Sequence, residues 1–225
     1  MVAQSTTFSP EVERRVSERV TALPAVHMTA MQTMATFMWR PLAVMGVMIL
    51  ISATIIAGVN SLKVDDFFGL ATPDLGAQAT FQSVQTWLPG YQFMGMGFMF
   101  AAITMILAAI LGRLRILGGT VQTSLGAKVV WPPFPMAARI FPMLMLFGMI
   151  VLLTQLGLSA WLATEAKAGD ALTVTQNADW LQGMRFAGVA IMLTGIAIAL
   201  YTITIIMRFM AQRVSTVAAE AMERD

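Results

Sequence analysis

The sequence contains no cysteine and only one histidine, His27. Without thiolates the chain cannot form a disulfide, ligate an iron–sulfur cluster or use a Cys nucleophile. One histidine cannot provide both axial ligands of a bis-His haem, nor build a His-rich metal cage. We therefore expect no haem and no iron–sulfur cofactor within this chain, and most membrane redox chemistry is excluded from it.

Charged side chains are also scarce. They make up 12% of the 225 residues, whereas hydrophobic residues make up 57%. A soluble domain carries about 25% charged residues, so the composition indicates a membrane protein. The formal net charge of +2 is too small to indicate a nucleic-acid partner, and the positions of the charges are more informative than their sum.

Four stretches lack Asp, Glu, Lys and Arg and are overwhelmingly apolar: 41–62, 91–112, 140–164 and 186–207. At a rise of about 1.5 Å per residue, each can cross the roughly 30 Å hydrocarbon core of a bilayer. Inside lipid each backbone N–H and C=O group needs a partner within its own segment, which favours helices. The sequence therefore predicts an all-α integral membrane protein with four antiparallel transmembrane helices.

The N-terminal segment predicts a further helix on the cytoplasmic side. Val12, Val16 and Val20 recur at i, i+4 and i+8, so they share one face of a helix among charged residues. We expect an amphipathic helix that lies on the membrane surface and leads into the first span. Nothing in this segment resembles a cleaved signal, so we expect the first span to be retained as an anchor.

These patterns divide the chain into an N-terminal cytoplasmic or interfacial segment (1–38), a four-helix transmembrane domain (39–210) and a cytoplasmic tail (211–225). Turn-forming and polar residues predict loops at 63–90 and 165–185, the second of them partly helical. Neither connection is large enough to form a separate domain.

The distribution of charge predicts the orientation. Most basic residues fall in the N-terminal segment, the 113–139 connection and the tail. The other two connections hold only Lys63, Lys167 and Arg185, together with an excess of acidic residues. By the positive-inside rule we expect a multi-pass protein of the cell (inner or plasma) membrane with both termini cytoplasmic.

A proline-rich stretch with aromatic and basic residues precedes the third span. We interpret it as an interfacial anchor, since Trp and Phe rings favour the headgroup region and a cation meets anionic lipids. Pro142 is expected in the first turn of the third span, where its missing amide is tolerated. A docking ridge for a cytoplasmic partner is the alternative. The anchor residues are Trp131, Pro132, Pro133, Phe134 and Arg139.

His27, Met31, Met34 and Met38 recur at i, i+4, i+7 and i+11, which places them on one helical face. Imidazole and thioether groups are soft ligands that suit Cu(I), so this stripe is a candidate metal site. Methionine also fills irregular apolar interfaces, and a methionine stripe at helical spacing is more often a packing surface. We favour the packing interpretation.

Small residues recur within the spans at spacings that allow close helix packing. Gly97 and Ala101 do so in the second span, and Gly188 and Gly195 in the fourth. Their partners are either other helices of this chain or helices of another subunit. Gln155 is a long polar side chain inside the third span, and we expect it to contact another helix or, alternatively, a bound quinone or lipid headgroup.

The spans carry no Asp, Glu, Lys, Arg or His and offer no acid–base pair, so we expect no catalytic residues in this chain. The sequence favours a non-catalytic integral subunit of a larger membrane complex, an oxidoreductase or a monooxygenase, that stabilises partner subunits and binds lipid. The first alternative is a small helper subunit of a multi-component transporter, and the second is a copper-handling membrane protein. The four-span layout is similar, in architecture alone, to the small membrane subunit of tripartite (TRAP) carriers, and this resemblance implies the first alternative.

Overall fold

A computed structural model describes residues 30–68, 75–124, 126, 129–130 and 136–222. Within these residues the chain is helical apart from short turns, and it contains no strand. Each helix is long and apolar enough to cross a membrane, which confirms an all-helical fold with four such helices and indicates a multi-pass membrane protein. The helices are α2 (Ala30–Phe68), α3 (Leu75–Ser124), α4 (Ala137–Ala168) and α5 (Ala171–Met222).

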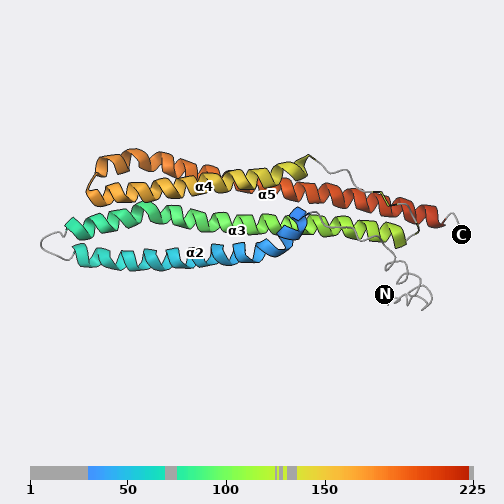
Figure 1. The fold of residues 1–225 in the computed structure, drawn as a ribbon, viewed down its shortest axis with the longest axis horizontal. Coiled ribbons are helices and arrows are strands. Elements are labelled where there is room, and N and C mark those ends of the chain that lie inside the picture. Colours follow the sequence, from blue (N-terminus) through green and yellow to red (C-terminus); the bar gives the residue numbers. More distant parts are fainter. Residues whose placement is uncertain (1–29, 69–74, 125, 127–128, 131–135, 223–225) are drawn as a thin grey trace, which may run out of the picture.

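Helix α3 occupies the centre of the arrangement. It packs against α2, α4 and α5, and α4 also packs against α5. Among the described residues α2 contacts α3 alone, so it lies at the side of a three-helix unit. Figure 1 shows α2 beside α3 and α4 beside α5, with α3 and α5 extending past the other two helices at one end.

The helices are longer than the predicted spans. Helix α3 has 50 residues and α5 has 52, which corresponds to about 75 Å each, against roughly 30 Å of hydrocarbon. The expectation of a loop at 63–90 was therefore wrong for 63–68 and 75–90, which are helical. The second connection was expected to be partly helical, and this is confirmed, since 165–168 and 171–185 are helical on either side of a short turn. Helix-forming Ala, Leu and Gln residues extend α3 and α5 beyond the apolar runs, and packing between these helices stabilises the extensions.

The predicted segment boundaries do not coincide with helix ends. Residues 30–38 belong to the same helix as the first span, and α5 continues through most of the predicted tail to Met222. The amphipathic stripe of Val12, Val16 and Val20 lies outside the described residues, so that prediction stays open.

Among the described residues three prolines lie inside helices. Pro41 and Pro89 fall at the predicted starts of the first two spans, yet α2 and α3 run through them. Figure 1 shows the first turns of α2, in blue, at an angle to the rest of that helix, as a proline near its start would produce. Because α4 begins at Ala137, Pro142 lies in its second turn, and the prediction of a first-turn position was wrong.

A tight turn joins α4 to α5 at one end of the bundle. We call this end the Asp170 end. Gly169 has φ 88°, and its N–H donates to the carbonyl of Ala166, while the N–H of Asp170 donates to the carbonyl of Glu165. This is a Schellman motif, which needs a residue that tolerates the left-handed region. The Asp170 carboxylate then accepts from the backbone N–H of Thr173 at 3.1 Å and caps α5. The opposite end is called the Ser124 end.

The middle of the bundle is packed with methionine, leucine and glycine. Met94, Met145, Leu152 and Met192 form a buried cluster contributed by α3, α4 and α5. A Cβ atom at Gly148 would lie 2.5 Å from Cγ of Met192, so α4 and α5 approach closely at this point. In lipid such close packing, rather than hydrophobic burial, drives the association of helices.

Candidate functional site

Polar side chains of α4 and α5 meet a backbone carbonyl of α3 near the Asp170 end. Gln155 and Ser159 of α4 are both fully buried, and Nε2 of Gln155 donates to Oγ of Ser159 at 2.6 Å. Arg185 of α5 reaches the same hydroxyl, with Nη2 3.2 Å from Oγ of Ser159. Nη2 of Arg185 also lies 3.4 Å from the carbonyl oxygen of Thr86 in α3. We call Gln155, Ser159, Arg185 and Thr86, together with Gly90 of α3, the polar cluster.

Gln155 has an incomplete set of hydrogen bonds. Its Oε1 atom is buried and has no partner among the described residues. If the amide is rotated by 180°, Oε1 accepts from the Ser159 hydroxyl and Nε2 is left without a partner instead. Either orientation leaves one buried polar atom that can bind a further group, at a position where an unpaired polar atom is costly.

The backbone of α3 shapes this region. Pro89 lacks an N–H, so the carbonyl of Gln85 loses its helical donor, and the next carbonyl, that of Thr86, accepts from Arg185. A Cβ atom at Gly90 would lie 2.8 Å from Nε2 of Gln155, so glycine is needed for α3 to approach α4 here. The proline and glycine thus admit polar side chains between closely packed helices.

Arg185 also lines a cavity of about 410 Å³ between α3, α4 and α5. The guanidinium group is half-buried, and its Nε atom is buried without a partner among the described residues. Phe81, Gln82 and Gln85 contribute to the wall from α3, and Leu181 contributes from α5. The polar cluster contains neither a carboxylate nor an imidazole. Its guanidinium, amide and hydroxyl groups can bind a ligand through hydrogen bonds and charge.

The small residues singled out from the sequence lie at contacts within this chain. A Cβ atom at Gly97 would lie 2.7 Å from Cδ1 of Leu152, and one at Gly188 would lie 2.8 Å from Cδ2 of the same leucine. Gly195 faces α4, where its Cβ would lie 3.3 Å from Sδ of Met145. Ala101 packs against the buried cluster that contains Leu152. These residues therefore bring α3, α4 and α5 together.

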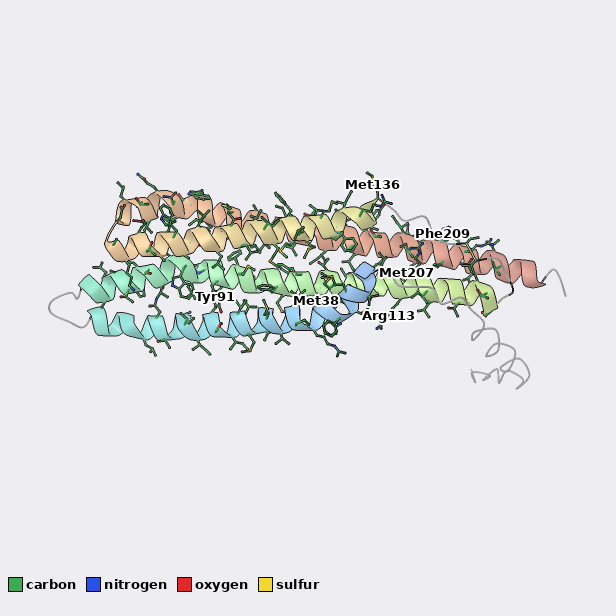
Figure 2. The ribbon with its side chains drawn as sticks, viewed as in Figure 1. Met38, Tyr91, Arg113, Met136, Met207 and Phe209 are labelled. Carbon is green, nitrogen blue, oxygen red and sulfur yellow. The ribbon has the colours of Figure 1, made fainter. Side chains whose placement is uncertain are left out.

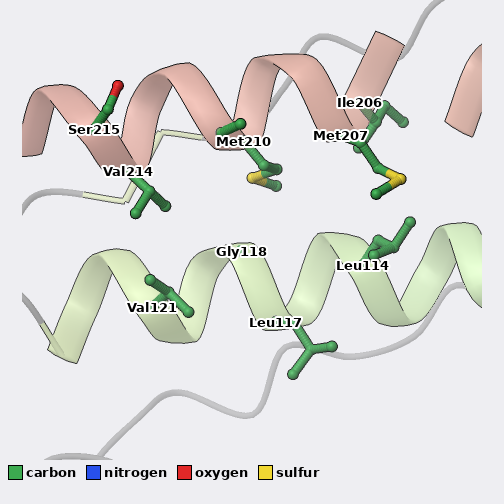
Figure 3. A pocket seen from close by; sticks show the side chains of 10 residues that line it. Leu114, Leu117, Gly118, Val121, Ile206, Met207, Met210, Val214 and Ser215 are labelled. Carbon is green, nitrogen blue, oxygen red and sulfur yellow. The ribbon is translucent and has the colours of Figure 1, made fainter. Parts of the chain in front are cut away.

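An apolar groove lies between α3 and α5 at the Ser124 end, where these two helices extend past the others. It has a volume of about 480 Å³ (Figure 3). The structure places Gly118 against Met210 and faces Val121 toward Val214 across the groove. Its walls are formed mainly by Leu114, Leu117, Val121, Met207, Met210 and Val214.

The predicted metal stripe is described only in part. His27 lies outside the described residues, whereas Met31, Met34 and Met38 all belong to α2. Met34 is exposed and Met38 is half-buried near the start of this helix (Figure 2). Within the part of the chain that the structure describes, no three His, Asp or Glu residues are grouped to hold a metal ion. The copper hypothesis remains a prediction.

The predicted interfacial anchor is also described only in part. Trp131, Pro132, Pro133 and Phe134 lie outside the described residues. Arg139 lies in the first turn of α4 with an exposed side chain, a position from which it can reach lipid headgroups.

Two functional candidates escaped the sequence analysis. Asn60 in α2 is 5% exposed, and its Nδ2 atom has no partner among the described residues. An amide within the apolar run 41–62 was the signal that could have identified it. Arg185 was interpreted as a loop cation, although its position directly before the fourth span, on the acidic side, could have marked it as unusual.

The comparisons with known proteins add no assignment: no family model, curated protein or solved structure matches this chain. The fold and the site therefore place the chain in a broad class of protein. It is a multi-pass all-helical membrane protein with a polar cluster in its helix bundle.

Proposed function

We propose that this chain is a non-catalytic integral subunit of a larger membrane complex, an oxidoreductase or a monooxygenase, in which it stabilises partner subunits and binds lipid. Its four helices cross the cell (inner or plasma) membrane in antiparallel order, with both termini cytoplasmic, as the charge distribution favours. The Asp170 end then lies outside the cell membrane and the Ser124 end lies in the cytoplasm.

Two glycines within the predicted spans carry this proposal. Gly58 of α2 and Gly157 of α4 have no described atom within 4 Å of the position that a Cβ would occupy. By contrast, Gly46, Gly97 and Gly148 each lie against a neighbouring helix. Glycine in a helix interior costs about 1 kcal/mol relative to alanine, so a glycine that meets no neighbour in its own chain suits contact with a second chain.

Other small residues accompany both glycines. Thr54 and Ser61 lie four residues before and three residues after Gly58, and both are exposed. Ala160 follows Gly157 on the same exposed side of α4. Small residues at these spacings allow another helix to approach closely, as in small-xxx-small packing. The partner that fits these faces is a transmembrane helix of another subunit.

The groove at the Ser124 end supports the same proposal. Most of its walls lie beyond the predicted spans, which end at residues 112 and 207, so acyl chains of the bilayer core do not reach most of it. A contiguous apolar surface outside the hydrocarbon core favours a protein partner. Arg208 and Arg213 lie on the same part of α5, and they would favour an acidic rim on that partner.

The test is co-purification of the full chain from its own membrane in a mild detergent. We expect Gly58→Leu and Gly157→Leu to lower the yield of partner subunits several-fold, because leucine holds the approaching helix away. The matched control is Gly183→Leu, which changes an equally open glycine outside the predicted spans and should leave the yield unchanged. Full retention of partners in both span variants would contradict the proposed interface.

A further inference from the structure

The cavity beside the polar cluster has the dimensions and the composition of a ligand site. Its volume of about 410 Å³ falls in the range of small-molecule pockets, which is roughly 300 to 1,000 Å³. Gln82, Gln85 and Gln182 provide amide groups, whereas Phe81, Leu162 and Leu181 provide apolar surface. A ligand with one polar and one apolar part matches this mixed wall.

Arg185 determines the charge of that ligand. Its guanidinium is half-buried, and both hydrogen bonds that the structure shows for it, to Thr86 and Ser159, go to neutral oxygen atoms. No described carboxylate forms an ion pair with it. A cation withdrawn from water without an opposite charge is costly, and neutral acceptors offset only part of that cost. A bound oxyanion would complete the site, because a guanidinium group recognises phosphate and carboxylate oxygens in pairs.

The position of the cavity indicates where the ligand comes from. Most of the cavity wall lies just beyond the predicted spans, which begin at Tyr91 in α3 and at Phe186 in α5 and end at Thr164 in α4. Trp161 and Trp180 are exposed on α4 and α5 at this end, and tryptophan favours the headgroup level of a bilayer. At the headgroup level of a bilayer, the anionic head of a lipid lies next to its apolar acyl chains.

We propose that this cavity binds the anionic head of an amphiphile, a phosphodiester, phosphate or carboxylate group attached to an apolar chain, with Arg185 as its ion-pair partner. The glutamine amides donate to the remaining oxygens, and Phe81 and Leu181 contact the first part of the apolar chain. The inference deepens the lipid-binding part of the proposed function, on which it rests, but it does not require a partner subunit.

The experiment measures ligand binding to the purified full chain in a neutral detergent. The probes are phosphatidylglycerol, decyl phosphate and, as the comparison with no net head charge, phosphatidylcholine, whose phosphodiester is neutralised by its own choline cation. Each is titrated while the unfolding temperature and direct binding are followed. We expect phosphatidylglycerol or decyl phosphate to bind at least about ten-fold more tightly than phosphatidylcholine, as expected for a charge-assisted contact. Binding of phosphatidylglycerol alone identifies a membrane lipid, and binding of decyl phosphate alone identifies a free amphiphile.

Three variants connect the binding to this site. Arg185→Gln should weaken anion binding about ten-fold or more, whereas Arg208→Gln, an exposed cation on the same helix, should leave it unchanged. Ala178→Trp fills the cavity without changing its charge and should also abolish binding, with circular dichroism confirming that the helices are retained. The inference is overturned if no anionic probe binds, if phosphatidylcholine binds equally well, or if Arg185→Gln and Ala178→Trp bind as the wild type does. Because the isolated chain is used, a failure here leaves the subunit proposal to its own test.

Discussion

Gly90 of α3 lies directly against the side chain of Gln155 of α4. A Cβ atom at position 90 would lie 2.8 Å from Nε2 of Gln155 and 3.0 Å from Oγ of Ser159. The contact brings a fully buried amide between two helices at the point where Pro89 removes one backbone hydrogen bond from α3. The polar cluster therefore depends on the absence of a side chain at position 90 as well as on the side chains of Gln155 and Ser159.

A methyl group at this position tests that dependence. We expect Gly90→Ala to lower the free energy of unfolding in detergent by about 1 to 3 kcal/mol, because the added atom overpacks the buried amide and hydroxyl. Gly157→Ala is the matched control, since its Cβ would meet no described atom and alanine is the better helix former. A Gly90→Ala protein as stable as the Gly157→Ala protein would contradict the close approach of α3 and α4.

The cap of α5 predicts a dependence on pH. The Thr173 hydroxyl, which donates to Asp170 at 2.6 Å, and then the backbone N–H of Thr173 lower the pKa of Asp170 below its ordinary value of 3.8. Because the folded-state pKa is the lower one, the charged cap stabilises the fold above the unfolded pKa, and this contribution disappears as pH falls through the folded pKa.

Asp170→Asn isolates the charge, because asparagine still caps a helix. We expect the wild type to unfold at a higher temperature than the variant near pH 6, and the difference to disappear as pH falls through the lowered pKa of the Asp170 carboxyl group. A difference that stays constant over this range would show that the charge of Asp170 does not stabilise the α4–α5 turn.

The hydropathy of the sequence was sufficient to predict the four helices, because an uncharged run such as 91–112 has few alternatives to a helix in lipid. It did not predict their full lengths. Residues 75–90 of α3 contain Ala, Gln and Leu together with glycine and proline, and their helical state depends on packing against α4 and α5. The loop prediction failed because local turn signals were outweighed by contacts between helices.

The candidate site was predictable only in part. Gln155 was expected to contact another helix or a bound group, but its hydrogen bond goes to Ser159 of its own helix, at the i+4 position that helical spacing brings close. The bond from Arg185 to Thr86 joins residues 99 positions apart, and no local pattern encodes it. The spacing of small residues also did not show that Gly58 is exposed and Gly97 is buried, since both glycines lie among small residues.

The topology can be tested directly because the natural chain has no cysteine. We expect Asp74→Cys and Asp170→Cys to react with a membrane-impermeant thiol reagent applied from outside, and Ser215→Cys to react only after the membrane is opened. The charge distribution is the physical reason, since the positive-inside rule predicts that the basic segments remain cytoplasmic. Labelling of position 74 from the cytoplasm alone would overturn the orientation.

The metal hypothesis leads to an analytical prediction. If His27 and the methionine stripe serve packing, the purified chain should hold no stoichiometric copper by elemental analysis. The variant His27→Ala should then leave any activity of the complex unchanged. Copper that is present in the wild type and lost in His27→Ala would favour the copper-handling function instead.

The most direct test of the subunit proposal is the mass of the assembly released from the native membrane in mild detergent, measured by native mass spectrometry. We predict species that contain this 24.4 kDa chain together with other integral membrane proteins, because α2 and α4 have open small-residue faces that suit contact with another helix. Species composed of this chain alone, under conditions that preserve other complexes from the same membrane, would contradict the proposal.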